Sequence, residues 1–214
     1  MCMKFLYRLL NALIVIALLQ PLSGSAETDF EDAVLLENAA LDYPDAEFES
    51  GREGWTLLSY VVNREGVAVD ALVEDSSGSP AFDKAAVAAE SQLRYTPARL
   101  TGAPVERCFS QQKITFQKPP HRYDVARRFE NDLGDVNKST RAGRHDEAAT
   151  MLAALDESYP RNLFEDARFW LTSANLAQAR GDLSGEISHL RKAIAYEGVY
   201  LPDALYAAAL KRLY

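Results

Sequence analysis

The sequence predicts an α+β fold: a small sheet of three strands with a helix, followed by an all-α region of helical hairpins. Two runs rich in β-branched and aromatic residues, Trp55–Asn63 and Val67–Glu74, flank a short turn, which is the pattern of a β-hairpin. Val105–Phe116 adds a third strand. Beyond the boundary at Lys118-Pro119-Pro120, apolar residues recur at helical spacing, so the second half is expected to be helical.

Each element of the first half has a local signal. The first strand is apolar on both faces, and we expect it to be more buried than the second. A helix is expected to follow the second strand, with Ser79 as its N-cap and Pro80 at its first position, because these residue types favour those positions. Its apolar stripe consists of Phe82, Ala85, Ala86, Ala89 and Leu93. Tyr95-Thr96-Pro97 ends the helix, and Thr101–Pro104 turns the chain back toward the third strand.

Residues 1–26 have the order of a secretory signal peptide. Lys4 and Arg8 are basic, Ala12–Leu19 is an uninterrupted apolar run, and small residues lead to Ala26. The apolar run is about half of the roughly 20 residues that a membrane-spanning helix needs. We therefore expect cleavage after Ala26 and a periplasmic protein. The alternative is an uncleaved segment that anchors the chain in the inner membrane.

The chain is acidic, with 31 Asp and Glu against 23 Lys and Arg and a formal net charge of −8. This balance argues against nucleic-acid binding, which needs a basic patch, and against a polybasic membrane-surface site. Cys2 would leave with the signal peptide, so Cys108 has no partner for a disulfide within the mature chain. We expect Cys108 to be a small buried hydrophobic residue on the third strand, with an intermolecular disulfide as the alternative.

The sequence offers no candidate catalytic, cofactor-binding or metal-binding residue. His121, His145 and His189 lie far apart and lack the spacing of a zinc site, so we expect solvated helix residues. The serine-rich loop before the first helix lacks the surroundings of a hydrolase nucleophile, and no glycine-rich phosphate loop is present. The adjacent acids Glu31-Asp32 and Glu165-Asp166 are expected to be solvated charges. The protein is therefore not expected to be an enzyme or to need a cofactor.

Several residues between Ala39 and Lys118 follow one another in a characteristic order and spacing. They are Tyr43-Pro44, Gly54, Gly66, Ser76-Ser77-Gly78, Asp83, Ala86, Tyr95-Thr96-Pro97-Ala98, Gly102, Pro104 and Phe116. In this order they resemble the C-terminal domain of TonB-family energy transducers, over residues 39–118. The resemblance implies a compact three-stranded antiparallel sheet with helices on one side. It also implies a docking role in which a partner strand joins the sheet edge.

The chain departs from the transducers of that family in three respects. The segment between the expected signal peptide and the domain is short and acidic, whereas transducers have a long proline-rich spacer. The domain itself is acidic, and it does not lie at the C-terminus. A chain this short is not expected to hold an inner-membrane motor and also reach the outer membrane.

Residues 121–214 resemble tetratricopeptide-type helical hairpins. Gly143 and Gly181 lie in two similar turns that are 38 residues apart, close to the usual repeat of about 34. We expect helices over Tyr123–Arg141, Leu163–Ala179 and Pro202–Tyr214. The alternative is a generic helical bundle, which needs only the periodicity. A repeat array would do no chemistry, but it would offer a concave binding face.

These observations predict a periplasmic protein-protein interaction module of the TonB family that docks a partner peptide by strand addition, in association with outer-membrane transport. The expected partner is a protein or peptide, such as an outer-membrane transporter, and not nucleic acid. One alternative is a genuine energy-transducing component of TonB-dependent uptake, anchored by the uncleaved N-terminal segment. A second alternative is an uncharacterised enzyme.

The third strand is the expected docking edge, because its polar centre at Ser110–Lys113 suits an edge better than a core. Alternation along the strand is expected to turn Cys108, Ile114 and Phe116 toward the helix. The expected partner-binding residues lie at the odd positions: Val105, Arg107, Phe109, Gln111 and Lys113. The alternative is that the helices that follow cover this edge.

Overall fold

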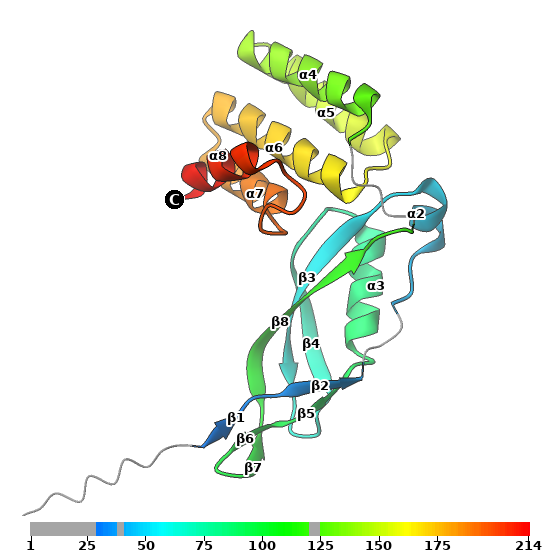
Figure 1. Cartoon of the computed structure of the whole chain (residues 1–214), viewed down its shortest axis with the longest axis vertical. Coiled ribbons are helices and arrows are strands. Elements are labelled where there is room, and N and C mark those ends of the chain that lie inside the picture. Colours follow the sequence, from blue (N-terminus) through cyan, green and yellow to red (C-terminus); the bar gives the residue numbers. More distant parts are fainter. Residues whose placement is uncertain (1–28, 38–40, 120–124) are drawn as a thin grey trace, which may run out of the picture.

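The computed structural model describes residues 29–37, 41–119 and 125–214. The predicted signal peptide and His121 lie outside the described residues. The fold is α+β, as predicted. Figure 1 shows a sheet with a helix beside it, a group of helices at one end of the long axis and short strands at the other end.

The central sheet contains β3 (Gly54–Val62), β4 (Ala68–Ser76) and β8 (Arg107–Phe116), all antiparallel, in the order β4-β3-β8. β3 lies in the middle and is buried or half-buried along its whole length, whereas much of β4 is exposed. The prediction that β3 is the more buried strand of the hairpin is confirmed, because β3, unlike β4, has a strand neighbour on each side.

The helix α3 (Pro80–Glu90) packs on one face of this sheet. Ser79 caps it as predicted, since its side chain accepts a hydrogen bond from the backbone N–H of Phe82. Phe82 is fully buried and stacks on Phe116 of β8, with ring centroids 4.3 Å apart. Ile114 belongs to the same cluster, so Ile114 and Phe116 face the helix as the alternation predicted.

Short elements surround the central sheet. They are β1 (Phe30–Glu31), β2 (Val34–Glu37), α2 (Asp45–Ser50), β5 (Arg94–Thr96), β6 (Ala98–Leu100) and β7 (Ala103–Val105). β1 pairs with β6 and β2 with β5, both antiparallel. The turn between β6 and β7 has positive φ at both Thr101 and Gly102, the backbone of a tight hairpin turn. The sequence predicted this turn but not β1 and β2, whose partners lie far along the chain.

Cys108 is exposed, so the prediction of a buried cysteine was wrong. Tyr60 and Val62 of β3 are two residues apart, but their partners Ser110 and Arg107 in β8 are three residues apart. The extra residue makes a β-bulge, which interrupts the alternation of side chains between the two faces. The alternation that holds for Ile114 and Phe116 therefore does not extend to Cys108.

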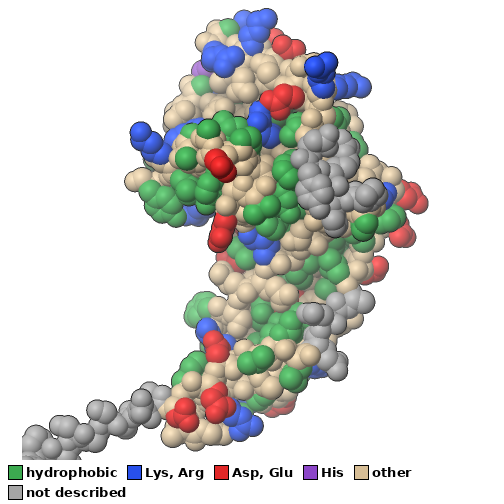
Figure 2. Space-filling model, viewed as in Figure 1, with side chains coloured by type: hydrophobic (Ala, Val, Ile, Leu, Met, Phe, Trp, Pro, Cys, Tyr) green, Lys and Arg blue, Asp and Glu red, His purple; other side chains and the backbone are tan. Residues whose placement is uncertain are grey.

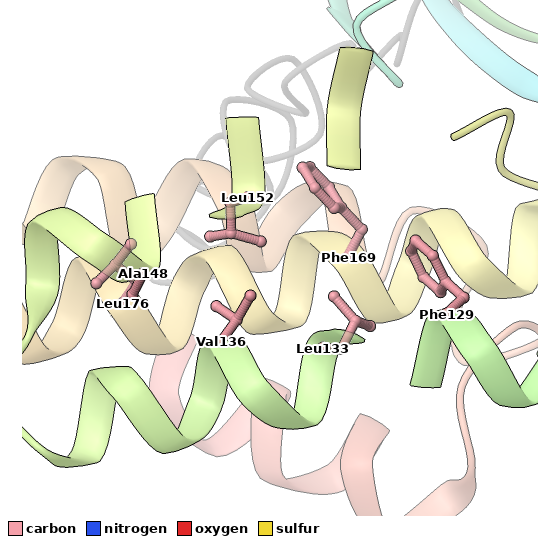
Figure 3. Close-up of a cluster of buried hydrophobic side chains, with 7 residues drawn as sticks. All are labelled: Phe129, Leu133, Val136, Ala148, Leu152, Phe169 and Leu176. Atoms are coloured by element: carbon pink, nitrogen blue, oxygen red, sulfur yellow. The ribbon is translucent and has the colours of Figure 1, made fainter. Parts of the chain in front are cut away.

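The second half is helical, as predicted. It contains α4 (Arg127–Arg141), α5 (His145–Ser158), α6 (Leu163–Arg180), α7 (Leu183–Ala193) and α8 (Asp203–Leu213). Figure 3 shows the buried cluster that joins the first three: Phe129, Leu133 and Val136 of α4, Ala148 and Leu152 of α5, and Phe169 and Leu176 of α6. None of the helices in the described ranges is long and apolar enough to cross a bilayer.

Glu165 and Asp166 are buried, so the prediction that they are solvated was wrong. Glu165 completes a capping box with Asn162 at the start of α6, and its carboxylate also accepts a hydrogen bond from the N–H of Ala126 at 3.0 Å. Asp166 accepts a hydrogen bond from Arg161 at 3.1 Å. Burial raises the pKa of Asp166, although Arg161 opposes this shift. These acids are tolerated inside because each is hydrogen-bonded.

His189 on α7 is half-buried and does not match the prediction of a solvated residue. Its ring stacks on Trp170 with centroids 5.3 Å apart. Its Nδ1 is buried without a hydrogen-bond partner among the described residues. Burial, together with the charge of Lys192, lowers the pKa of His189, which favours the neutral form of the ring.

The sheet and the helices meet at a small polar and aromatic interface. The N–H of Glu53 donates to the carbonyl of Arg161 at 2.8 Å, and its carboxylate accepts from the N–H of Leu163 at 3.1 Å. Trp55 packs edge-on against Tyr196, which follows α7. None of the four buried apolar clusters in the described ranges draws members from both parts. The interface therefore lies between apolar clusters of the sheet and apolar clusters of the helices, and none of them extends across it.

Candidate functional site

β8 is the candidate docking strand because one of its edges is free. In the part of the chain that the structure describes, β8 pairs with β3 and with no other strand. A free strand edge presents backbone N–H and C=O groups with which an extended segment of another chain can pair.

Hydrogen bonds at the start of β3 settle the direction of its backbone. The N–H of Trp55 donates to Ser77 Oγ at 3.1 Å, and the carbonyl of Trp55 accepts from the N–H of Ser77 at 2.9 Å. Ser77 follows β4, so both groups of Trp55 point away from β8. Backbone groups alternate in direction along a strand, so those of Thr56 point toward β8.

The same alternation identifies the free groups of β8. Thr56 and Leu58 lie opposite Ile114 and Gln112, so these even-numbered residues of β8 make the hydrogen bonds to β3. The N–H and C=O of Gln111, between them, point to the free edge. The side chain of Gln111 is exposed as well, which leaves this residue accessible to a partner.

The other predicted edge residues are placed differently. Val105 lies in β7, paired with Ala98, and is not part of the β8 edge. Arg107 begins β8, and its Nε lies 2.7 Å from a carboxylate oxygen of Asp32. Phe109 lies at the bulge and is exposed. Arg107, Phe109 and Gln111 therefore share the first half of the strand.

Lys113 lies where the helices reach the sheet. Its Nζ donates to the carbonyl of Ala195 and lies 4.7 Å from the ring centre of Tyr196. Burial lowers the pKa of Lys113. Thr115 is hydrogen-bonded to the hydroxyl of Tyr196. The segment between α7 and α8 thus contacts side chains at one end of β8, a contact that the sequence did not reveal because it joins residues about 80 positions apart.

A buried polar cluster lies under β8, on the side of α3. Glu90 is fully buried, and its Oε1 accepts a hydrogen bond from the Tyr95 hydroxyl at 3.0 Å. The hydroxyl oxygens of Tyr95 and Tyr60 lie 2.9 Å apart, and Gln112 of β8 approaches the Tyr95 hydroxyl at 3.4 Å. Burial raises the pKa of Glu90, although the hydrogen bond from Tyr95 opposes this.

We expect the protein to lose stability as the pH rises through the raised pKa of Glu90. The unfolded chain releases this proton at the ordinary pKa of a glutamate, whereas the folded protein retains it to higher pH. The stabilisation is therefore complete below the ordinary pKa and is lost as the pH rises through the folded value. Urea unfolding from about pH 4 to pH 8 should show a smaller loss of stability in Glu90→Gln than in the wild type.

Glu49→Gln is the control for this experiment, because Glu49 is exposed. Tyr60 and Tyr95 are the titratable groups that face Glu90, and burial raises the pKa of both, so both stay neutral over this range. Identical pH profiles for Glu90→Gln and the wild type would contradict the prediction.

The described residues contain no group of three or more His, Cys, Asp and Glu side chains placed to hold a metal ion. On the face shown in Figure 2, acidic and basic side chains are interspersed over the surface.

Comparison with known proteins identifies the sheet region. Residues 39–117 match the family model described as Gram-negative bacterial TonB protein C-terminal. These residues form a TonB C-terminal-like domain. TonB-family domains of this kind are non-enzymatic protein-interaction modules.

Two solved structures are similar to this TonB C-terminal-like domain. One is the C-terminal domain of TonB from Pseudomonas aeruginosa, with 24% identity and a TM-score of 0.38, covering 47% of this chain and 95% of that one. The other is the TonB2 protein of Vibrio anguillarum, with 26% identity and a TM-score of 0.32, covering 45% of this chain and 91% of that one. No curated protein matches the chain. β1, β2 and the helices α4 to α8 lie outside the family match.

Proposed function

We propose that the protein is a periplasmic interaction module of the TonB family whose β8 edge receives an extended peptide from a partner, such as an outer-membrane transporter. The observation that carries the proposal is the outward direction of the Gln111 N–H and C=O on a strand with one free edge. Main-chain pairing there would supply affinity, and the side chains beside the edge would supply selectivity.

We further propose that residues 39–118 and 121–214 are two domains, the second built from tetratricopeptide-like hairpins. Two features support this proposal. Gly143 follows α4 and Gly181 follows α6, both with positive φ, so the hairpins α4–α5 and α6–α7 turn in the same way. Each part also has buried clusters of its own. The helices would hold a second binding surface at a fixed place beside the β8 edge.

The experiment that tests strand addition is Gln111→Pro, with Gln112→Pro as the matched control. Proline has no N–H, so Gln111→Pro removes a donor that points to the free edge and leaves the bonds to β3 in place. Gln112→Pro removes a donor that bonds to β3 and leaves its acceptor without a partner, which should cost about 1 to 3 kcal/mol of stability. The probes are synthetic peptides that copy periplasm-facing segments of outer-membrane transporters, titrated by calorimetry.

The Gln111→Pro protein should melt close to the wild-type temperature and bind these peptides at least about tenfold more weakly. In the free wild-type protein, the Gln111 amide should exchange with solvent quickly and the Gln112 amide slowly. Unchanged binding by Gln111→Pro, or slow exchange at Gln111 in the free protein, would mean that the edge is already occupied. Failure of every peptide to bind the wild type would also overturn the proposal.

A further inference from the structure

Phe109 is the least protected large apolar side chain in the described ranges, apart from the C-terminal Tyr214. It is 87% exposed and lies in the first half of β8, two residues before Gln111. Leaving an aromatic ring in water forfeits the gain that burial gives elsewhere in the fold. Phe109 therefore contributes little to the stability of the protein through packing.

The backbone of Phe109 is also unfavourable. Its φ is +56°, in the left-handed region that bulky residues seldom adopt because Cβ crowds the carbonyl oxygen. This residue lies in the bulge between Arg107 and Ser110, the pairing partners of Val62 and Tyr60. A bulge re-aims side chains at a sheet edge. Residues with a strained backbone cluster at functional sites, and Phe109 combines such a backbone with an exposed side chain.

The side chain of Arg107 makes two hydrogen bonds at the start of the bulge. The Nη1 of Arg107 donates to the carbonyl of Cys108 at 2.7 Å, and its Nε donates to Asp32 at 2.7 Å. Asp32 lies between β1 and β2, outside the residues that match the TonB family. A segment that precedes the matched domain thus helps to orient the peptide unit that leads into Phe109.

We propose that Phe109 is the apolar anchor of the β8 edge, which takes up an apolar side chain of the extended peptide that pairs with β8. This inference rests on the proposed function. Side chains on neighbouring antiparallel strands lie about 5 Å apart, so a peptide added at Gln111 brings its own side chains within reach of Phe109. Arg107 and Asp32 act as positioning residues. They orient the bulge through hydrogen bonds and offer the peptide no apolar side chain.

The test uses Phe109→Gly in the full chain with the peptide that binds the wild type. Glycine adopts positive φ without steric cost, so this variant removes the ring and relieves the strain together. We expect its melting temperature to equal or exceed that of the wild type, and its affinity for the peptide to fall about tenfold or more. Leu72→Ala is the control, because Leu72 is 64% exposed on β4, the opposite edge strand, and should leave affinity unchanged.

The outcomes separate the anchor from the proposed function. Wild-type affinity in Phe109→Gly, with loss of binding in Gln111→Pro, would overturn the anchor and leave strand addition in place. Wild-type affinity in both variants would overturn both. A clear drop in the melting temperature of Phe109→Gly would show that the ring supports the fold, and that result would also overturn the anchor.

Discussion

Replacing Gly66 with alanine is expected to destabilise the sheet by about 3 kcal/mol or more, because a left-handed backbone coincides there with a lack of space. Gly66 lies in the turn between β3 and β4 with φ of +77°. A Cβ atom would overlap the backbone carbonyl oxygen of Tyr95. The carbonyl of Gly66 also accepts a hydrogen bond from the Tyr95 N–H at 2.9 Å. Relief of the overlap would move β5 and break that bond.

Gly51→Ala is the matched control for Gly66→Ala. Gly51 has almost the same φ, +76°, but nothing lies within 4 Å of its Cβ position. We expect Gly51→Ala to lower the free energy of unfolding by only about 1 to 2 kcal/mol, which is the cost of a left-handed backbone at alanine. The two free energies of unfolding can be compared by urea denaturation followed by circular dichroism. Equal losses would show that the close approach of β5 to the turn is not needed for the fold.

Glu53→Ala is the substitution expected to have the second large effect, because it removes a buried carboxylate that holds the sheet and the helices together. The side chain is 5% exposed and accepts hydrogen bonds from the N–H groups of Lys118 at 3.0 Å and Leu163 at 3.1 Å. Leu163 is the first residue of α6, where the helix dipole favours a negative charge. Charge-assisted hydrogen bonds contribute about 1.5 to 3 kcal/mol each to stability. We therefore expect Glu53→Ala to lower the free energy of unfolding by about 3 kcal/mol or more.

The Glu53→Ala protein should also show whether the two parts can separate. If they are two domains, both should remain folded while Trp55, which is buried against Tyr196, becomes accessible to a fluorescence quencher. Glu49→Ala is the control, because Glu49 is exposed, and its effect should stay within about 0.5 kcal/mol. Full unfolding of Glu53→Ala at the temperature where Glu49→Ala is folded would contradict the division into two domains.

The central hairpin, α3 and the helical second half could be predicted because their signals are local. The cap at Ser79, the proline after it and the apolar spacing of α3 involve residues within one or two helical turns of each other. The hairpin of β3 and β4 was predicted from two apolar runs beside a short turn. The predicted residues Arg107, Phe109, Gln111 and Lys113 do lie on β8, since a polar run with flanking apolar residues is a local pattern too.

The details of the candidate site could not be predicted, because they depend on strand pairing and on contacts between distant segments. The bulge that exposes Cys108 and Phe109 exists only in the register of β8 against β3, and register is a property of two strands. Lys113 is half-buried because a loop about 80 residues away lies against it.

By itself, the sequence determined the α+β class, the cap at the start of α3 and the inward direction of Ile114 and Phe116, because helix caps and side-chain periodicity act over short distances. It did not determine every helix boundary, since α3 ends at Glu90, before Leu93 of the expected apolar stripe. Only the tertiary structure decided that Glu165 and Asp166 are buried and that Asp32 reaches Arg107. An acidic side chain can enter the interior only where donors surround it. Those donors come from neighbouring elements such as the start of α4 and from Arg161, and their arrangement around the acids exists only once the chain has folded.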